Sequence, residues 1–73
     1  MIVIKLREAI AAFEKKTGTT LSYSDLADRT GLARATIEAL GSRPQYNTTL
    51  KTIDKLCQTL ECGLSDLLEY SES

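Results

Sequence analysis

The stretch LADRTGLARATIEAL, residues 26–40, places two short apolar-patterned segments on either side of a glycine with almost no spacer. Ala27 is small and Gly31 follows four residues later, so two helices can cross closely through a turn of three or four residues. The apolar residues after the turn recur at helical spacing and would face inward: Leu32, Ile37 and Leu40. The stretch therefore predicts two helices packed at a steep angle.

Helical periodicity continues on both sides of this stretch. The first helix carries the i, i+3, i+4, i+7 pattern at Leu6, Ala9, Ile10 and Phe13. A later helix repeats apolar residues at Leu50, Ile53, Leu56, Cys57 and Leu60, and a last short one offers Leu64, Leu67 and Leu68. Glycines at 18, 31, 41 and 63 favour helix ends. We predict helices at about 6–17, 23–30, 33–41, 49–61 and 64–70.

Three helix starts carry different capping signals. Ser22 with Asp25 three residues later is typical of a capping box at the start of the second helix. Thr48 is predicted to cap the helix that follows the polar connector GSRPQYNTT. Ala33 offers no capping side chain to the third helix.

The first residues alternate, with Ile2, Ile4 and Leu6 on one parity, which favours a short extended segment before the first helix. Such an edge could pair with the same segment of a second copy. Alternatively, Ile2 and Ile4 cover the core of their own domain. With no convincing sheet and no internal repeat, residues 1–73 are predicted to form one all-α domain of five helices.

The composition is that of an ordinary soluble globular domain. Of 73 residues, 42% are hydrophobic and 26% charged, enough for a single lean core. No stretch approaches the roughly 18 apolar residues of a membrane span. MIVI is too short for a signal peptide, so we expect a cytoplasmic protein without membrane contact.

The net charge of −1 conceals an uneven distribution along the chain. All nine Lys and Arg lie within residues 1–60, which hold six acids and therefore carry a formal charge of +3. Glu61, Asp66, Glu69 and Glu72 make the C-terminus acidic. Because partner binding depends on how charge is distributed over the surface, the net charge alone excludes few classes of binding partner.

No metal, cofactor or catalytic site is predicted. The chain has no histidine, and its two cysteines, Cys57 and Cys62, form neither a standard zinc cluster nor a disulfide framework. We interpret Cys57 as a small buried residue and place Cys62 near a helix end; a redox role is the alternative. No carboxylate pair has a visible pocket in so small a chain, so we expect no enzyme.

Two segments together resemble a known family. SYSDLADRTGLARATIEALGS followed by TTLKTIDKLCQTLECGLSDLLEY is similar to the helix-turn-helix domain of the phage repressor and Cro family, also called the Xre family. The similarity covers roughly residues 6–70. It implies a five-helix lambda-repressor-like domain whose third helix, residues 33–41, enters the major groove of double-stranded DNA.

The resemblance implies which side chains meet DNA bases. The positions that would face base edges are Ala33, Arg34, Ala35 and Glu38, with Ala39 nearby. Arg34 is the principal candidate because a guanidinium can bridge O6 and N7 of guanine. The alternative is a solvated surface arginine that pairs loosely with Glu38 one turn on. The alanines can touch thymine methyls but offer few hydrogen bonds. At Ala33 the family often has a helix-capping serine, and its absence is expected to cost the third helix about 1 kcal/mol.

The resemblance also implies contacts to the DNA backbone. Tyr23 and Ser24 hold the positions at the start of the second helix, although the family commonly has glutamine where Tyr23 stands. Further candidates lie in the third helix, in the loop after it and at the next helix start: Thr36, Arg43, Gln45, Asn47, Thr48 and Thr49. An exposed polar loop without DNA contact is the alternative for the loop residues.

Two functions are therefore weighed. The first is a sequence-specific DNA-binding transcriptional regulator, acting as a homodimer on half-sites about 34 Å apart. The second is a protein-interaction module, or an antitoxin-type partner-binding protein, on the same fold with weak or no DNA binding. Near-neutral charge, the acidic tail and the alanine-rich third helix favour the second.

Overall fold

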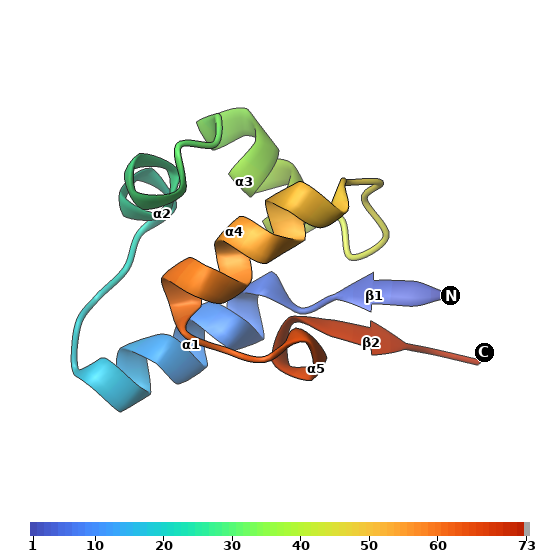
Figure 1. Cartoon of the computed structure of the whole chain (residues 1–73), viewed down its shortest axis with the longest axis horizontal. Coiled ribbons are helices and arrows are strands. Elements are labelled where there is room, and N and C mark those ends of the chain that lie inside the picture. The colour runs from blue at the N-terminus through green and yellow to red at the C-terminus, as the bar shows by residue number, and fades with distance from the viewer. Residues whose placement is uncertain (73) are drawn as a thin grey trace.

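The computed structural model describes residues 1–72 and contains, within them, five helices and a small sheet (Figure 1). The elements in chain order are β1 (Ile2–Ile4), α1 (Leu6–Thr17), α2 (Tyr23–Thr30), α3 (Arg34–Ser42), α4 (Leu50–Leu60), α5 (Leu64–Leu67) and β2 (Leu68–Tyr70). The prediction of a mainly helical domain with five helices is confirmed. Ser73, the last residue of the predicted domain, lies outside the described residues.

The predicted starts of α3 and α4 shift by one residue because their first predicted residues are N-caps. The predicted ends differ by one residue as well, α3 ending at Ser42 and α4 at Leu60. Ala33 has extended backbone and no side-chain cap, as its methyl side chain requires. Thr49, in place of the predicted Thr48, caps α4, because its hydroxyl accepts the N–H of Thr52 at 3.2 Å. The capping box of α2 is confirmed: Ser22 Oγ accepts the Asp25 N–H, and Asp25 Oδ2 accepts the Ser22 N–H, each at 3.1 Å.

The prediction of a helix over 64–70 and of no sheet is wrong. The helix ends at Leu67, and Leu68–Tyr70 pair antiparallel with Ile2–Ile4, in the register Ile2↔Tyr70, Val3↔Glu69 and Ile4↔Leu68. This pairing satisfies backbone groups of two chain ends that are far apart in sequence, which local periodicity cannot register. The N-terminal segment thus pairs within its own chain.

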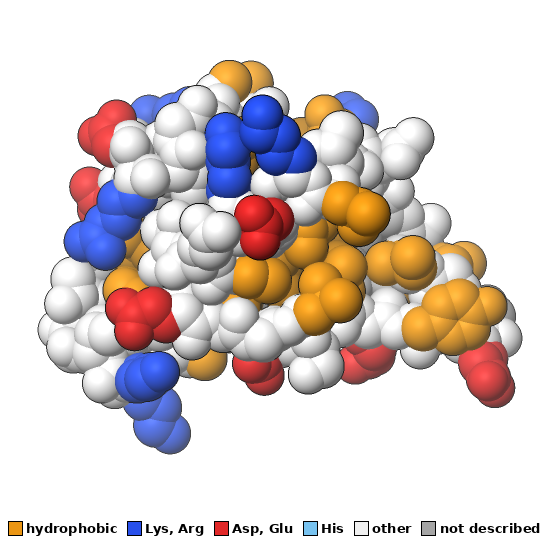
Figure 2. Space-filling view, viewed as in Figure 1, with side chains coloured by type: hydrophobic (Ala, Val, Ile, Leu, Met, Phe, Trp, Pro, Cys, Tyr) orange, Lys and Arg blue, Asp and Glu red, His pale blue; other side chains and the backbone are white. Residues whose placement is uncertain are grey.

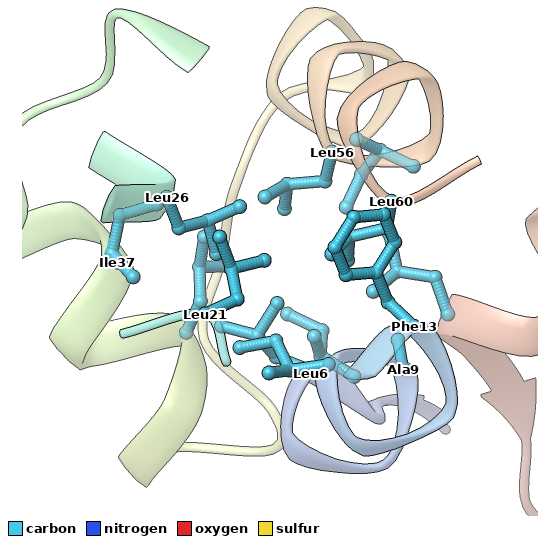
Figure 3. Close-up of a cluster of buried hydrophobic side chains, with 13 residues drawn as sticks. Leu6, Ala9, Phe13, Leu21, Leu26, Ile37, Leu56 and Leu60 are labelled. Atoms are coloured by element: carbon cyan, nitrogen blue, oxygen red, sulfur yellow. The ribbon is translucent and has the colours of Figure 1, made fainter. Parts of the chain in front are cut away.

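The core lies between α1, α4 and the α2–α3 pair. Figure 3 shows these side chains meeting: Leu6, Ala9 and Phe13 from α1, Leu21 and Leu26 from the left of the view, Ile37 from α3, and Leu56 and Leu60 from α4. Ile4 is buried in the same cluster, which confirms that it covers its own core. Ile2, by contrast, is 60% exposed.

Two leucines predicted to face inward are exposed instead. Leu50 is 83% and Leu64 59% exposed, and each is the first residue of its helix. Helical side chains lean toward the helix N-terminus, so the side chains of Leu50 and Leu64 extend past the starts of their helices, whereas Leu6, the first residue of α1, is buried in the core. Periodicity alone does not distinguish these positions from those one turn later.

Candidate nucleic-acid interface

The turn between α2 and α3 is held by hydrogen bonds at both ends. Gly31 adopts a left-handed conformation, with φ 75°, and its N–H donates to the Ala27 carbonyl at 2.8 Å. The buried Thr30 hydroxyl donates to the Leu26 carbonyl at 2.8 Å and accepts the N–H of Leu32 at 3.2 Å. Sequence reasoning missed Thr30, because a threonine at a helix end gives no signal of burial.

Tyr23 determines how closely the start of α2 approaches α3. Its half-buried ring packs against the core, and a Cβ built on Gly41 would overlap its hydroxyl. The ring therefore occupies the space that a side chain at 41 would fill. Tyr23 is predicted to contact a phosphate, and Gly41 is predicted to end α3. The helix continues through Gly41 to Ser42. The packing of the pair could not be read from spacing.

The outer face of α3 carries the predicted base-contact residues. Of these residues Ala33, Arg34, Ala35 and Glu38 are exposed and Ala39 is half-buried; Thr36, a predicted backbone contact, is also half-buried. Arg34 Nε donates to Glu38 Oε1 at 3.1 Å, and both side chains are more than half exposed. The pairing expected as the alternative is thus present in the free chain. An exposed pair of this kind contributes only a few tenths of a kcal/mol, so it leaves the guanidinium readily available.

Some of the predicted phosphate-contact side chains are exposed, and others already make contacts within the protein. Ser24 is exposed at the start of α2, and Arg43, Gln45 and Asn47 are exposed in the loop after α3. Gln45 Nε2 lies 2.7 Å from the Met1 sulfur. Thr48 is half-buried, and the Thr49 hydroxyl is occupied in the α4 cap. Because Tyr23 lies on Gly41, the start of α2 is brought beside the C-terminal half of α3.

Two side chains have shifted pKa values, one in the capping box of α2 and one beside the core. The capping hydrogen bonds from Ser22 lower the pKa of Asp25. Burial, followed by the neighbouring Cys57, raises the pKa of Cys62, which keeps that thiol protonated. Both cysteines are free and half-buried against the core. Within residues 1–72, no three His, Cys, Asp or Glu side chains are grouped as metal ligands would be.

Comparison with known proteins identifies the arrangement of α2, the Gly31 turn and α3. Residues 15–73 match the model of the Cro/C1-type helix-turn-helix DNA-binding domain. This chain belongs to that family. The match covers α2, the Gly31 turn and α3, and it confirms the resemblance drawn from the sequence. The family is a DNA-binding type rather than a typically enzymatic one.

A curated relative supports the same assignment. The chain is similar to the uncharacterized HTH-type transcriptional regulator YozG of Bacillus subtilis (strain 168), with 32% identity over 50 residues. The aligned region is 68% of this chain and 60% of the relative, so the chain spans about three fifths of that protein's length. Among the described residues, no helix combines the length and apolarity needed to cross a bilayer.

Proposed function

We propose that this domain binds operator DNA sequence-specifically and regulates transcription, with α3 in the major groove. The observation that carries the proposal is the exposed outer face of α3 on a frame fixed by Gly31 and Thr30. A helix held at its base and bare on its outer side has the shape that a major groove accepts. The relative's name as a transcriptional regulator supports the same role.

Arg34 supplies the main sequence discrimination in this proposal. On DNA its guanidinium exchanges the Glu38 carboxylate for O6 and N7 of a guanine, a contact worth about 1–3 kcal/mol against the wrong base. Glu38 then accepts from a cytosine amino group or continues to orient the arginine. The methyl groups of Ala33, Ala35 and Ala39 read thymine methyls.

Phosphate contacts position α3 and carry no sequence information. Ser24, Arg43, Gln45 and Asn47 have the best support because their side chains are exposed. Thr36, Thr48 and Thr49 would contribute mainly through nearby backbone N–H groups at helix starts. Tyr23 has the least support, because its ring already packs on Gly41.

One subunit reads few base pairs, so we propose that the protein acts in the cytoplasm as a homodimer on two-fold half-sites. Selection from a random pool of double-stranded DNA supplies the operator, and a palindromic result supports the dimer. Binding of that operator should weaken steeply with added salt, because phosphate contacts release counterions.

The decisive variant is Arg34→Ala, compared with Lys15→Ala, which removes an exposed positive charge from the last turn of α1. Arg34→Ala should raise the operator Kd by roughly 5- to 100-fold and flatten the preference for guanine at one position per half-site. Lys15→Ala should leave both unchanged. An unchanged base preference in Arg34→Ala would contradict the role of Arg34, and wild-type protein that binds no DNA at low salt would contradict the proposed function.

The second candidate, a protein-interaction module or antitoxin-type partner-binding protein, is favoured by the alanine-rich face of α3. Three of its five predicted base-contact positions are alanines, which offer DNA no hydrogen bonds. Absence of DNA binding at low salt, together with purification in a stoichiometric complex with another protein, would select this candidate.

A further inference from the structure

An apolar surface lies away from α3, over the sheet and the starts of α4 and α5. We call it the ribbon surface and define it by Ile2, Leu50, Leu64, Leu68 and Tyr70. Ile2 and Tyr70 are 60% and 71% exposed, alongside the 83% of Leu50 and 59% of Leu64. Figure 2 shows hydrophobic side chains gathered toward the sheet, whereas Lys and Arg lie mainly along the upper and left parts of that face.

The surface is exposed because the two strands extend beyond the helices (Figure 1). Side chains two residues apart in a strand share a face, so Ile2 lies on the same face as the buried Ile4. Ile2 pairs with Tyr70 at the outer end of the sheet, where no described helix lies beneath them. The face that covers the core at Ile4 therefore continues uncovered at its tip.

The surface is continuous from end to end. One hollow is lined by Ile2 and Leu68 together with Leu50, and a second by the same two residues together with Leu64 and Tyr70. Ile2 and Leu68 thus form its middle, with Leu50 at one end and Leu64 and Tyr70 at the other.

We propose that the ribbon surface is where a second copy of this chain packs, giving a two-fold dimer. A large side chain offers on the order of 150–200 Å² when fully exposed, so the four exposed residues present on the order of 500 Å². Two copies would bury about 1,000 Å² from these residues alone, which reaches the size that a specific interface needs. This size falls in the range of the largest apolar patch on a typical monomer, which is often functional.

The charges around the surface suit contact with itself. Its defining residues are all uncharged, so a two-fold contact brings no like charges together at its centre. Lys51 adjoins the Leu50 end and Glu72 adjoins the Tyr70 end, and both side chains are exposed. Glu69 lies on the opposite face of the sheet, where it pairs with Lys5. When the Leu50 end of each copy faces the Tyr70 end of the other, the basic end of each copy meets the acidic end of its mate.

This assignment differs from pairing of the N-terminal edges. One edge of β1 is taken by β2, and on the other the Ile4 N–H donates to the Pro44 carbonyl at 2.7 Å. The apolar face is therefore the better surface for a second copy. The sheet lies away from α3 in Figure 1, so α3 can read bases while a second copy covers the ribbon surface. Four phosphate-contact candidates line the hollow at the Leu50 end and would lie at the edge of the contact between copies: Gln45, Asn47, Thr48 and Thr49. The proposal rests on the two-fold DNA binding proposed above, but the dimer forms without DNA.

The test is the mass of the whole chain in solution, measured by sedimentation across protein concentration without DNA. The variants are Leu50→Glu and Leu64→Glu, both at exposed helix starts where an acidic residue favours the helix. Each should raise the dimer dissociation constant at least about tenfold while leaving the circular dichroism spectrum unchanged. Ala11→Glu adds the same charge on the exposed side of α1 and should leave the dimer intact.

A charge swap tests the orientation. Leu50→Lys and Leu64→Glu should each be monomeric alone, yet associate when mixed. A mixture that stays monomeric overturns the end-to-end arrangement. Wild-type protein that is monomeric at about 500 μM, or a dimer indifferent to both glutamates, overturns the interface. A monomer that still shifts operator DNA leaves the proposed function standing, whereas a dimer that binds no DNA refutes that function alone.

Discussion

Tyr23 and Gly41 act as one pair in setting the spacing between α2 and α3. The aromatic ring at the start of α2 occupies the volume that any side chain at 41 would require. Glycine inside a helix ordinarily costs about 1 kcal/mol relative to alanine. Here the absence of a side chain at Gly41 lets α2 pack closely against α3, the helix that presents Arg34.

We expect Gly41→Ala to destabilise the wild-type protein by about 1–3 kcal/mol, because Tyr23 must move out of a packed position. In a Tyr23→Ala background the same change should be neutral or stabilise by up to about 1 kcal/mol through helix propensity. Chemical unfolding of the four proteins in this double-mutant cycle measures the difference. Equal effects in both backgrounds would show that the two residues are not coupled.

At the scale of the element, α2 depends on its capping box. Ser22 and Asp25 satisfy each other's backbone N–H, and these hydrogen bonds lower the pKa of the Asp25 carboxyl. α2 has two buried residues, Leu26 and Thr30, and its start is held by this local pairing together with the packing of Tyr23 on Gly41.

Ser22→Ala should cost about 1 kcal/mol at neutral pH. The pH dependence follows from the lowered pKa of Asp25: the folded carboxyl titrates below the unfolded one, so its contribution is present above the unfolded pKa. That contribution is lost as the pH falls through the folded pKa. Thermal unfolding between neutral and strongly acidic pH measures it.

The matched control for this prediction is Asp28→Asn, which removes the same charge from the same helix but lies outside the capping box. Asp25→Asn should flatten the acid limb of the stability curve more than Asp28→Asn does. Identical curves for the two variants would show that the capping box does not govern this limb.

At the scale of the whole molecule, the sheet joins the two chain ends and closes one side of the core. The Lys5 N–H donates to the Leu67 carbonyl at 2.7 Å, and Lys5 Nζ lies 3.6 Å from Glu69 Oε1. The sheet therefore anchors α5, whose four residues could not hold a helix alone.

Ile4 and Ile2 provide a matched pair on one face of β1. Ile4→Ala should destabilise the fold by about 2–4 kcal/mol, because its side chain is 7% exposed in the core. Ile2→Ala should cost less than about 1 kcal/mol, since its side chain is mostly exposed. Urea unfolding at low protein concentration, where self-association does not contribute, measures both. A large loss from Ile2→Ala there would place that side chain in the monomer core.

Much of the DNA-binding frame could be predicted from the sequence. The Gly31 turn, the inward positions of Ile37 and Leu40 and the capping box are encoded by residues within one or two turns of each other. Such local signals are periodic spacing and backbone preferences, which a single sequence displays directly. The outward face of α3 follows from the same periodicity, because residues opposite the apolar stripe point outward. Its assignment to DNA bases rests on the resemblance to the Xre family.

The sequence by itself determined the five helices, their order and the face of α3 that is left bare. Tertiary structure alone decided the pairing of β1 with β2, the packing of the Tyr23 ring against Gly41 and the exposure of Leu50 and Leu64. The physical reason is the separation in sequence between the residues that interact. Helices arise from contacts three or four residues apart, whereas strand pairing and interhelical packing depend on residues brought together only when the chain has folded.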